Sequence, residues 1–232
     1  NCYYSTGDYG RALALHEQNK AICEELGDRD GVARACSGLG NCYYSTGDYG
    51  RALALHEQRK AMAEALRDRA GVAAACGNLG NCYQSIGNYG RALALHEQRK
   101  AMAEALGDRA GVARACGNLG ICYNTTGDYR RALALHEQAK AICDELGDRN
   151  GVAKACGNLG NCYYSTGDYG RALALHEKAK AICEGLGDRD GVAKACSGLG
   201  NCYYSTGDYG RAIALHEQRK AICEELGDMD GV

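Results

Sequence analysis

The stretch NCYYSTGDYGRALALHEQNKAICEELGDRDGVARACSGLG, residues 1–40, recurs with few changes, starting again at residues 41, 81, 121 and 161. A shortened copy occupies residues 201–232. Repetition at a fixed period of this length is typical of a solenoid, in which each unit buries its apolar face only against its neighbours. The repeat therefore predicts a row of stacked modules, whose usual product is a long surface for contact with a partner rather than a pocket for chemistry.

The same self-similarity leaves no boundary between domains. We expect one domain over residues 1–232, made of about six repeats. The sequence begins without Met inside a repeat, so we expect a piece of a longer array. Self-association through end repeats that lack polar caps remains open. The predicted repeats are 1–40, 41–80, 81–120, 121–160, 161–200 and the partial 201–232.

Charge and hydropathy exclude several classes of partner. The formal net charge is −2, so no overall field favours nucleic acid or an anionic membrane. No apolar run approaches the roughly 20 residues that cross a bilayer, and no signal-peptide pattern opens the chain. We therefore expect a cytoplasmic protein without nucleic-acid or membrane partners.

Each repeat contains two helical segments separated by helix-breaking residues. Asp28 is expected to cap a helix over about 29–46, and Gly47 to end it in a left-handed conformation. Asp48 is expected to cap a second helix over about 49–66. No segment has the pattern of a strand. The predicted fold class is all-α, an α-solenoid of stacked antiparallel helix pairs.

Helical spacing assigns faces to both segments. In the first, Ala35, Leu39 and Cys42 share an apolar arc, while Arg34 and Asn41 lie on the opposite side. In the second, the polar residues expected to be mostly solvated are Arg51, Glu57, Gln58, Arg59 and Glu64.

The fifteen cysteines fall at three positions of the repeat. At one of these positions, Ala63 and Ala103 replace the cysteine, so the site requires a small apolar side chain. The spacing from Cys36 to Cys42 does not fit a C-x-x-C zinc or redox motif. Buried, reduced thiols are the favoured interpretation, with oxidation sensing or an unforeseen metal as the alternative.

Certain residues within each repeat resemble a known signature. The run from Asn78 to Tyr83, followed by Gly87, Tyr89 and Ala92, looks like the helix-turn-helix pattern of tetratricopeptide (TPR) repeats. The resemblance implies a right-handed superhelix. The 40-residue unit, with H-E-Q at 96–98 and L-G-D-R at 106–109, resembles the TPR array of the Pins/LGN-type cell-polarity adaptors.

In TPR arrays the first helix of each pair lines the inner, concave surface. The resemblance therefore places the polar side of these helices in a groove. The candidate peptide-binding residues are Arg34, Asn41, Tyr44, Asn78, Asn81, Arg114, Asn118, Lys154, Asn158, Asn161, Tyr164, Lys194 and Asn201.

The chemistry of this set favours an extended peptide. Asn offers both a donor and an acceptor to free backbone groups, while Arg and Lys attract acidic side chains. The predicted function is a protein-interaction scaffold that binds an extended, acidic peptide segment.

One alternative is a regulatory or sensor TPR region of a larger signalling NTPase or motor adaptor. A helical-repeat nucleic-acid binder is disfavoured because 27 basic residues are balanced by 29 acidic ones. The remaining alternative is that the Asn and Lys residues only keep an exposed helix face in contact with water and bind no partner.

Catalysis and cofactor binding have little support in the sequence. A histidine precedes glutamate once in every repeat, but equivalent residues should lie about 10 Å apart, whereas zinc bonds are about 2 Å long. We expect each histidine to pack between helices with one nitrogen hydrogen-bonded. The Asp28 to Gly31 segment lacks the full calcium-loop pattern, and Ala70 and Ala110 replace Asp30. We predict no enzyme activity, no metal and no cofactor.

Overall fold

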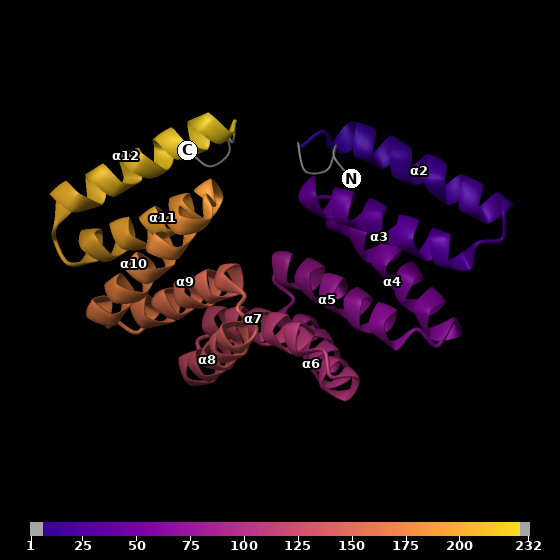
Figure 1. Cartoon of the computed structure of the whole chain (residues 1–232), viewed down its shortest axis with the longest axis horizontal. Coiled ribbons are helices and arrows are strands. Elements are labelled where there is room, and N and C mark those ends of the chain that lie inside the picture. Colours follow the sequence, from indigo (N-terminus) through magenta and orange to yellow (C-terminus); the bar gives the residue numbers. More distant parts are fainter. Residues whose placement is uncertain (1–6, 228–232) are drawn as a thin grey trace. The chain divides into compact units, whose positions relative to one another are not determined.

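The computed structural model describes residues 7–227, which form helices joined by short turns (Figure 1). The chain divides into two compact units, Asn1–Ala115 and Cys116–Val232, hereafter unit 1 and unit 2. The helices of the described part are α2 (Tyr9–Glu25), α3 (Arg29–Ser45), α4 (Tyr49–Ala65), α5 (Arg69–Ser85), α6 (Tyr89–Leu106), α7 (Arg109–Thr125), α8 (Tyr129–Glu145), α9 (Arg149–Ser165), α10 (Tyr169–Leu186), α11 (Arg189–Ser205) and α12 (Tyr209–Leu226).

Local capping sets the ends of these helices. The Asp28 side chain accepts a hydrogen bond from the Gly31 N–H at 2.9 Å, and the Asp48 side chain accepts one from the Arg51 N–H at 3.0 Å. Gly47 has a φ of 78°, so it ends the first helix in the left-handed region. The predicted helices over 29–46 and 49–66 are confirmed, each one residue shorter because Thr46 and Leu66 are C-caps.

One turn departs from this rule. Arg67 has a φ of 55°, although the matching position carries glycine in other repeats, such as Gly107. A side chain in the left-handed region costs roughly 1–2 kcal/mol. Unit 1 therefore holds a small, local conformational penalty at the α4–α5 turn.

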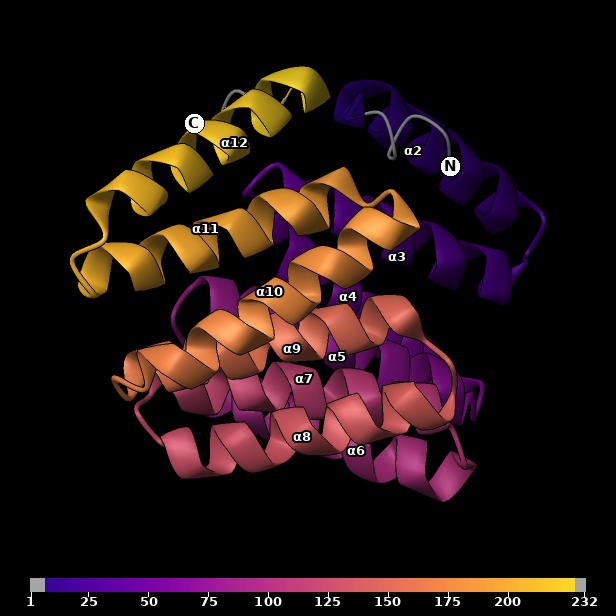
Figure 2. The same ribbon diagram turned by 60° about the vertical axis from the view of Figure 1, so that its left-hand side comes forward.

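Consecutive helices pack against each other within each unit. In unit 1, the pairs α2–α3, α3–α4, α4–α5 and α5–α6 are in contact, and α3 also contacts α5. In unit 2, helices α8 to α12 pack in the same consecutive way, and α9 contacts α11 (Figures 1 and 2). The predicted all-α solenoid of stacked helix pairs is confirmed. None of the helices within residues 7–227 combines the length and the apolar character that a membrane span requires.

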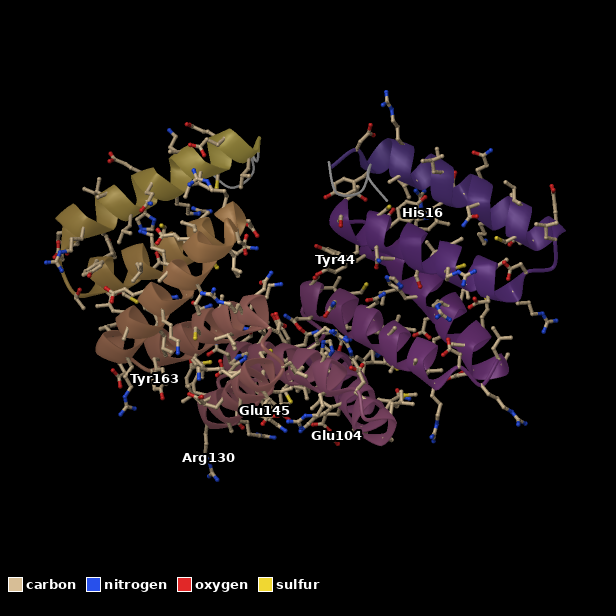
Figure 3. All side chains as sticks on the ribbon, viewed as in Figure 1. His16, Tyr44, Glu104, Arg130, Glu145 and Tyr163 are labelled. Atoms are coloured by element: carbon tan, nitrogen blue, oxygen red, sulfur yellow. The ribbon has the colours of Figure 1, made fainter. Side chains whose placement is uncertain are left out.

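Small residues allow the close approach of paired helices around a buried histidine. His56 is 1% exposed, and its ring packs on Gly40, where an added Cβ would lie 2.6 Å from the His56 Cε1 atom. His96 packs on Gly80 in the same way. Figure 3 shows His16 between α2 and α3. The prediction that the histidines pack between helices is confirmed for the buried set His56, His96, His136 and His176.

For His96, the predicted hydrogen bond of one ring nitrogen is wrong. Both ring nitrogens of His96 are buried without a hydrogen-bond partner, so this ring is held by packing alone. Burial lowers the pKa of His56 to about 4, which keeps its imidazole neutral. These histidines therefore behave as core residues at neutral pH.

The thiols also lie in the core, as predicted. All fourteen cysteines in the described part are buried and free. Burial raises the pKa of Cys82 to about 11, so its thiol stays protonated at neutral pH.

The prediction that Arg59 is solvated is wrong. Its side chain is only 11% exposed, because it crosses the start of α5 and its Nη2 atom donates to the Asp68 Oδ2 atom at 3.4 Å. Gly71, at the start of α5, leaves the space that the guanidinium fills.

Candidate functional site

The predicted peptide-binding residues form a polar stripe along the first helix of each pair. On α3, Arg34 and Asn41 are exposed, while Ala35, Cys36 and Leu39 are buried on the other side. We call the thirteen predicted residues the polar stripe. Its exposed members are Arg34, Asn41, Arg114, Lys154, Asn161, Lys194 and Asn201, and its half-buried members are Tyr44, Asn78, Asn81, Asn118, Asn158 and Tyr164.

Part of the polar stripe joins neighbouring repeats. In unit 1, the Asn78 Nδ2 atom donates to the Asn41 Oδ1 atom at 3.4 Å, and the Tyr44 hydroxyl lies 3.0 Å from the Ser85 hydroxyl. Tyr44 stands at the end of α3 (Figure 3). These side chains link α3 to α5, so a ligand that binds them would compete with contacts within the protein.

The link between tyrosine and serine recurs in unit 2. The Tyr164 hydroxyl lies 3.0 Å from the Ser205 hydroxyl, which joins α9 to α11. The Asn161 backbone oxygen accepts a hydrogen bond from the Ser165 hydroxyl at 3.0 Å, which leaves the Asn161 amide side chain outside that bond. The Asn161 side chain is exposed.

Most basic residues of the polar stripe pair with carboxylates of the same chain. Arg34 binds Asp30 and Lys194 binds Asp190, each one helical turn away at 2.5 Å. Arg114 lies 3.6 Å from Asp108. Such exposed pairs contribute little stability, but they neutralise the positive charge that was predicted to attract an acidic ligand. Sequence spacing could have shown the pairs of Arg34 and Lys194, since acid and base four residues apart lie on one helix face.

Lys154 differs from these residues. Asn150 takes the place of the aspartate one turn before it, and Lys154 has no ion pair within residues 7–227. Its side chain is therefore an exposed, unneutralised cation on α9. Asn158 and Asn161 follow it at the i+4 and i+7 positions, so all three lie on one side of that helix.

Unit 1 contains another cationic group, Arg99, which was not predicted from the sequence. Arg99 extends from α6 against Gly77 of α5, where an added Cβ would overlap its Nη1 atom. Burial and the nearby positive charge of Arg114 lower the pKa of Arg99. The carboxylate of Asp108, which acts on Arg99 electrostatically, is paired with Arg114. The sequence signal was that Arg99 stands where the fourth and fifth repeats carry the small residues Ala139 and Ala179.

No metal centre accompanies these residues in the described part of the chain. Over residues 7–227, His, Cys, Asp and Glu side chains nowhere form a group of three that could hold a metal ion.

Two ends of the described array expose apolar side chains. Leu15 on α2 is 46% exposed, whereas Leu55 in the next repeat is half-buried. Ile213 on α12 is 58% exposed, whereas Leu173 in the preceding repeat is half-buried. Self-association through end repeats stays a prediction.

Stacked helix pairs with a period of 40 residues define an α-helical repeat protein. Residues 1–65, 66–145 and 151–225 match the family model of the tetratricopeptide repeat. The chain belongs to the tetratricopeptide repeat family, as its residues predicted. None of the curated proteins compared with it matches.

Several solved structures share this fold. BtubC (BKLC) from P. vanneervenii is 24% identical, with a TM-score of 0.77 over 94% of this chain and 92% of that one. A Rap protein complexed with Competence and Sporulation Factor is 17% identical, with a TM-score of 0.79 over 97% and 66%. A Signal Transduction ATPase with Numerous Domains from Pyrococcus horikoshii, which has a tetratricopeptide repeat sensor, is 15% identical, with a TM-score of 0.73 over 97% and 36%. At these identities the likeness concerns the fold.

Proposed function

We propose that this protein is an interaction scaffold whose polar stripe binds an extended segment of a partner protein, with α9 of unit 2 as its main contact. The observation that carries the proposal is the unpaired Lys154 beside Asn158 and Asn161 on one side of α9. Solvation alone does not explain asparagines in the middle of a helix, because asparagine is a poor helix former there.

The three side chains suit an extended backbone. Each asparagine amide can donate to a backbone carbonyl and accept from a backbone N–H, and an extended peptide leaves both groups available. The ammonium of Lys154 would bind one carboxylate of the partner. The sequence predicted an acidic peptide. Because Arg34, Arg114 and Lys194 already have carboxylate partners, the proposal now requires only one acidic residue in the partner segment, opposite Lys154.

The fold likeness supports a binding function without defining its residues. The Rap protein noted above is complexed with Competence and Sporulation Factor, and TPR solenoids present long surfaces to their partners. The alternative of a sensor region within a larger protein places the same surface against another part of that protein.

A display library of random twelve-residue peptides tests the proposal directly. The whole chain is used as bait, and peptides enriched on the wild type are measured against an Asn158→Ala/Asn161→Ala variant. Loss of two hydrogen bonds of about 1 kcal/mol each should weaken binding on the order of 30-fold. The matched control changes two exposed residues of the second helix, Glu177→Ala/Lys178→Ala, and should leave binding within about twofold.

The salt dependence of binding tests the contribution of the Lys154 charge separately from that of the asparagines. A Lys154→Met variant keeps most of the length of the side chain but removes its charge. Wild-type binding should weaken as salt rises, because exposed charges are screened over about 8–10 Å, and the variant should respond less. If the asparagine variant binds all selected peptides as tightly as the wild type, the surface on α9 is not the binding site.

A further inference from the structure

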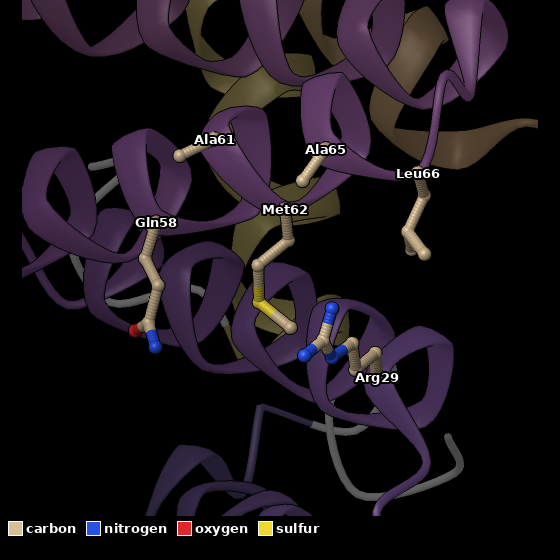
Figure 4. A pocket seen from close by; sticks show the side chains of 6 residues that line it. All are labelled: Arg29, Gln58, Ala61, Met62, Ala65 and Leu66. Carbon is tan, nitrogen blue, oxygen red and sulfur yellow. The ribbon is translucent and has the colours of Figure 1, made fainter.

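An apolar hollow lies in unit 1 beside the start of α3 and the second half of α4 (Figure 4). Its volume is about 320 Å³, near the lower end of the range for ligand pockets. This size suits one or two side chains of a partner. Arg29 of α3 lines the hollow together with Gln58, Ala61, Met62, Ala65 and Leu66 on the α4 side.

Arg29 is the one charged residue of this lining. Its guanidinium lies next to the end of the Met62 side chain (Figure 4). Within residues 7–227 it forms no ion pair. Leu66 is 43% exposed at the edge of the hollow. The site therefore combines exposed apolar surface with a cation that lacks a counter-charge.

The last repeat shows which group fits opposite this arginine. Arg189 and Glu225 are separated by 36 residues, as are Arg29 and Ala65, and the Arg189 Nη2 atom donates to the Glu225 Oε2 atom. Ile222, which takes the position of Met62, is only 2% exposed there. Where this carboxylate is present, the neighbouring apolar side chain is covered.

The preceding repeat supplies the comparison within unit 2. Gly185 takes the position of Glu225, and Ile182 takes that of Ile222 but is only half-buried. An added Cβ on Gly185 would lie 3.8 Å from the Arg149 Nη2 atom, so the arginine again faces this position. The same isoleucine is covered or partly exposed according to the residue three positions later.

We infer that the hollow in unit 1 is a second binding site, which accepts a partner peptide carrying a carboxylate next to a large apolar side chain. The carboxylate takes the place of the missing glutamate opposite Arg29 and receives charge-assisted hydrogen bonds from its planar guanidinium. The apolar side chain covers Met62, Ala65 and Leu66, whose removal from water favours binding. This site is independent of the polar stripe.

The test follows the methyl signal of Met62 by NMR in protein labelled with ¹³C at methionine methyl groups. The chain has three methionines, so a Met62→Leu variant suffices to assign the signal. The probes are acetyl-Glu-Leu-Leu-amide and acetyl-Gln-Leu-Leu-amide, which differ only in charge. The glutamyl peptide should shift the Met62 signal in a saturable way, and the glutaminyl peptide should bind at least about fivefold more weakly.

Two substitutions add the same charge at different places, one as a test and the other as its control. Ala65→Glu should restore the pair seen at Arg189 and abolish the response, because its carboxylate occupies the site. Ala54→Glu adds an equal charge at an exposed position of α4 outside the hollow and should leave the response unchanged. The inference is overturned by equal affinity for the two peptides, by an unchanged response in Ala65→Glu, or by no Met62 shift up to about 10 mM peptide.

Discussion

Acid is expected to destabilise unit 1 through the buried His96. Its ring is fully buried against Gly80 of α5, and neither ring nitrogen has a hydrogen-bond partner. Burial, with a smaller contribution from the charge of Arg99, lowers the pKa of His96 from 6.5 to about 4. The folded protein therefore holds this imidazole neutral at a pH where the unfolded chain protonates it.

The sign and size of the effect follow from proton linkage. The folded-state pKa is depressed, so the stability is fully present above pH 6.5 and is lost as the pH falls toward about 4. The full loss is about 3 kcal/mol, and about 2.5 kcal/mol of it is lost by pH 4.5.

Urea unfolding followed by far-UV circular dichroism at pH 7 and at pH 4.5 measures this loss. A His96→Leu variant has a side chain of similar volume and no titratable group at this position. The contributions of all other titratable groups to the pH dependence of stability therefore cancel when the two proteins are compared. At pH 7 the two should differ by less than about 1.5 kcal/mol. Between pH 7 and pH 4.5 the wild type should lose about 2.5 kcal/mol more than the variant. Equal losses in the two proteins would refute the argument that His96 is kept neutral by its packing.

Three further changes have defined outcomes. Gly160→Ala puts a Cβ 2.7 Å from the His176 Nε2 atom and should cost about 1–3 kcal/mol of unfolding free energy, whereas Gly157→Ala on the same helix meets nothing within 4 Å and should add about 0.5–1 kcal/mol. Thermal denaturation of the pair checks this, and effects of the same sign would contradict it. Arg67→Gly should raise stability by about 1 kcal/mol because it removes a side chain from the left-handed region, and Gly107→Arg should lower it similarly; no change in either would disprove the strain. Cys162 is fully buried and burial raises its pKa to about 11, so iodoacetamide should label it far more slowly in the native than in the urea-unfolded protein, as peptide mass spectrometry would show; equal rates would contradict its burial.

The helices and their ends were predictable because short-range interactions determine them. Asp28 and Asp48 bond backbone groups three residues later, and Gly47 ends a helix through its own backbone conformation. The 40-residue period then implied that each apolar face is buried by the next copy. The exposed side of each first helix followed from the same helical spacing.

The candidate sites were predictable only in part. Whether a basic side chain is neutralised depends on which carboxylates lie near it in the folded chain. Arg59 and Arg99 have the same position in successive repeats, yet Arg59 binds Asp68 while Arg99 lies against Gly77. The difference arises because Arg114 takes the aspartate that would serve Arg99, whereas Ala74 leaves Asp68 to Arg59.

The family, the helix pairs and the polar stripe could be predicted from the sequence alone, because capping acts over a few residues and the repeat recurs at a fixed interval. Tertiary structure decided which basic side chains remain unpaired and where apolar surface stays open. Within residues 7–227 no carboxylate pairs with Lys154, and the hollow beside Arg29 persists because Ala65, 36 residues further along the chain, has no carboxylate. The energy of a charged or apolar side chain depends on what lies within a few ångströms of it, and in a solenoid those neighbours come from adjacent helices and adjacent repeats.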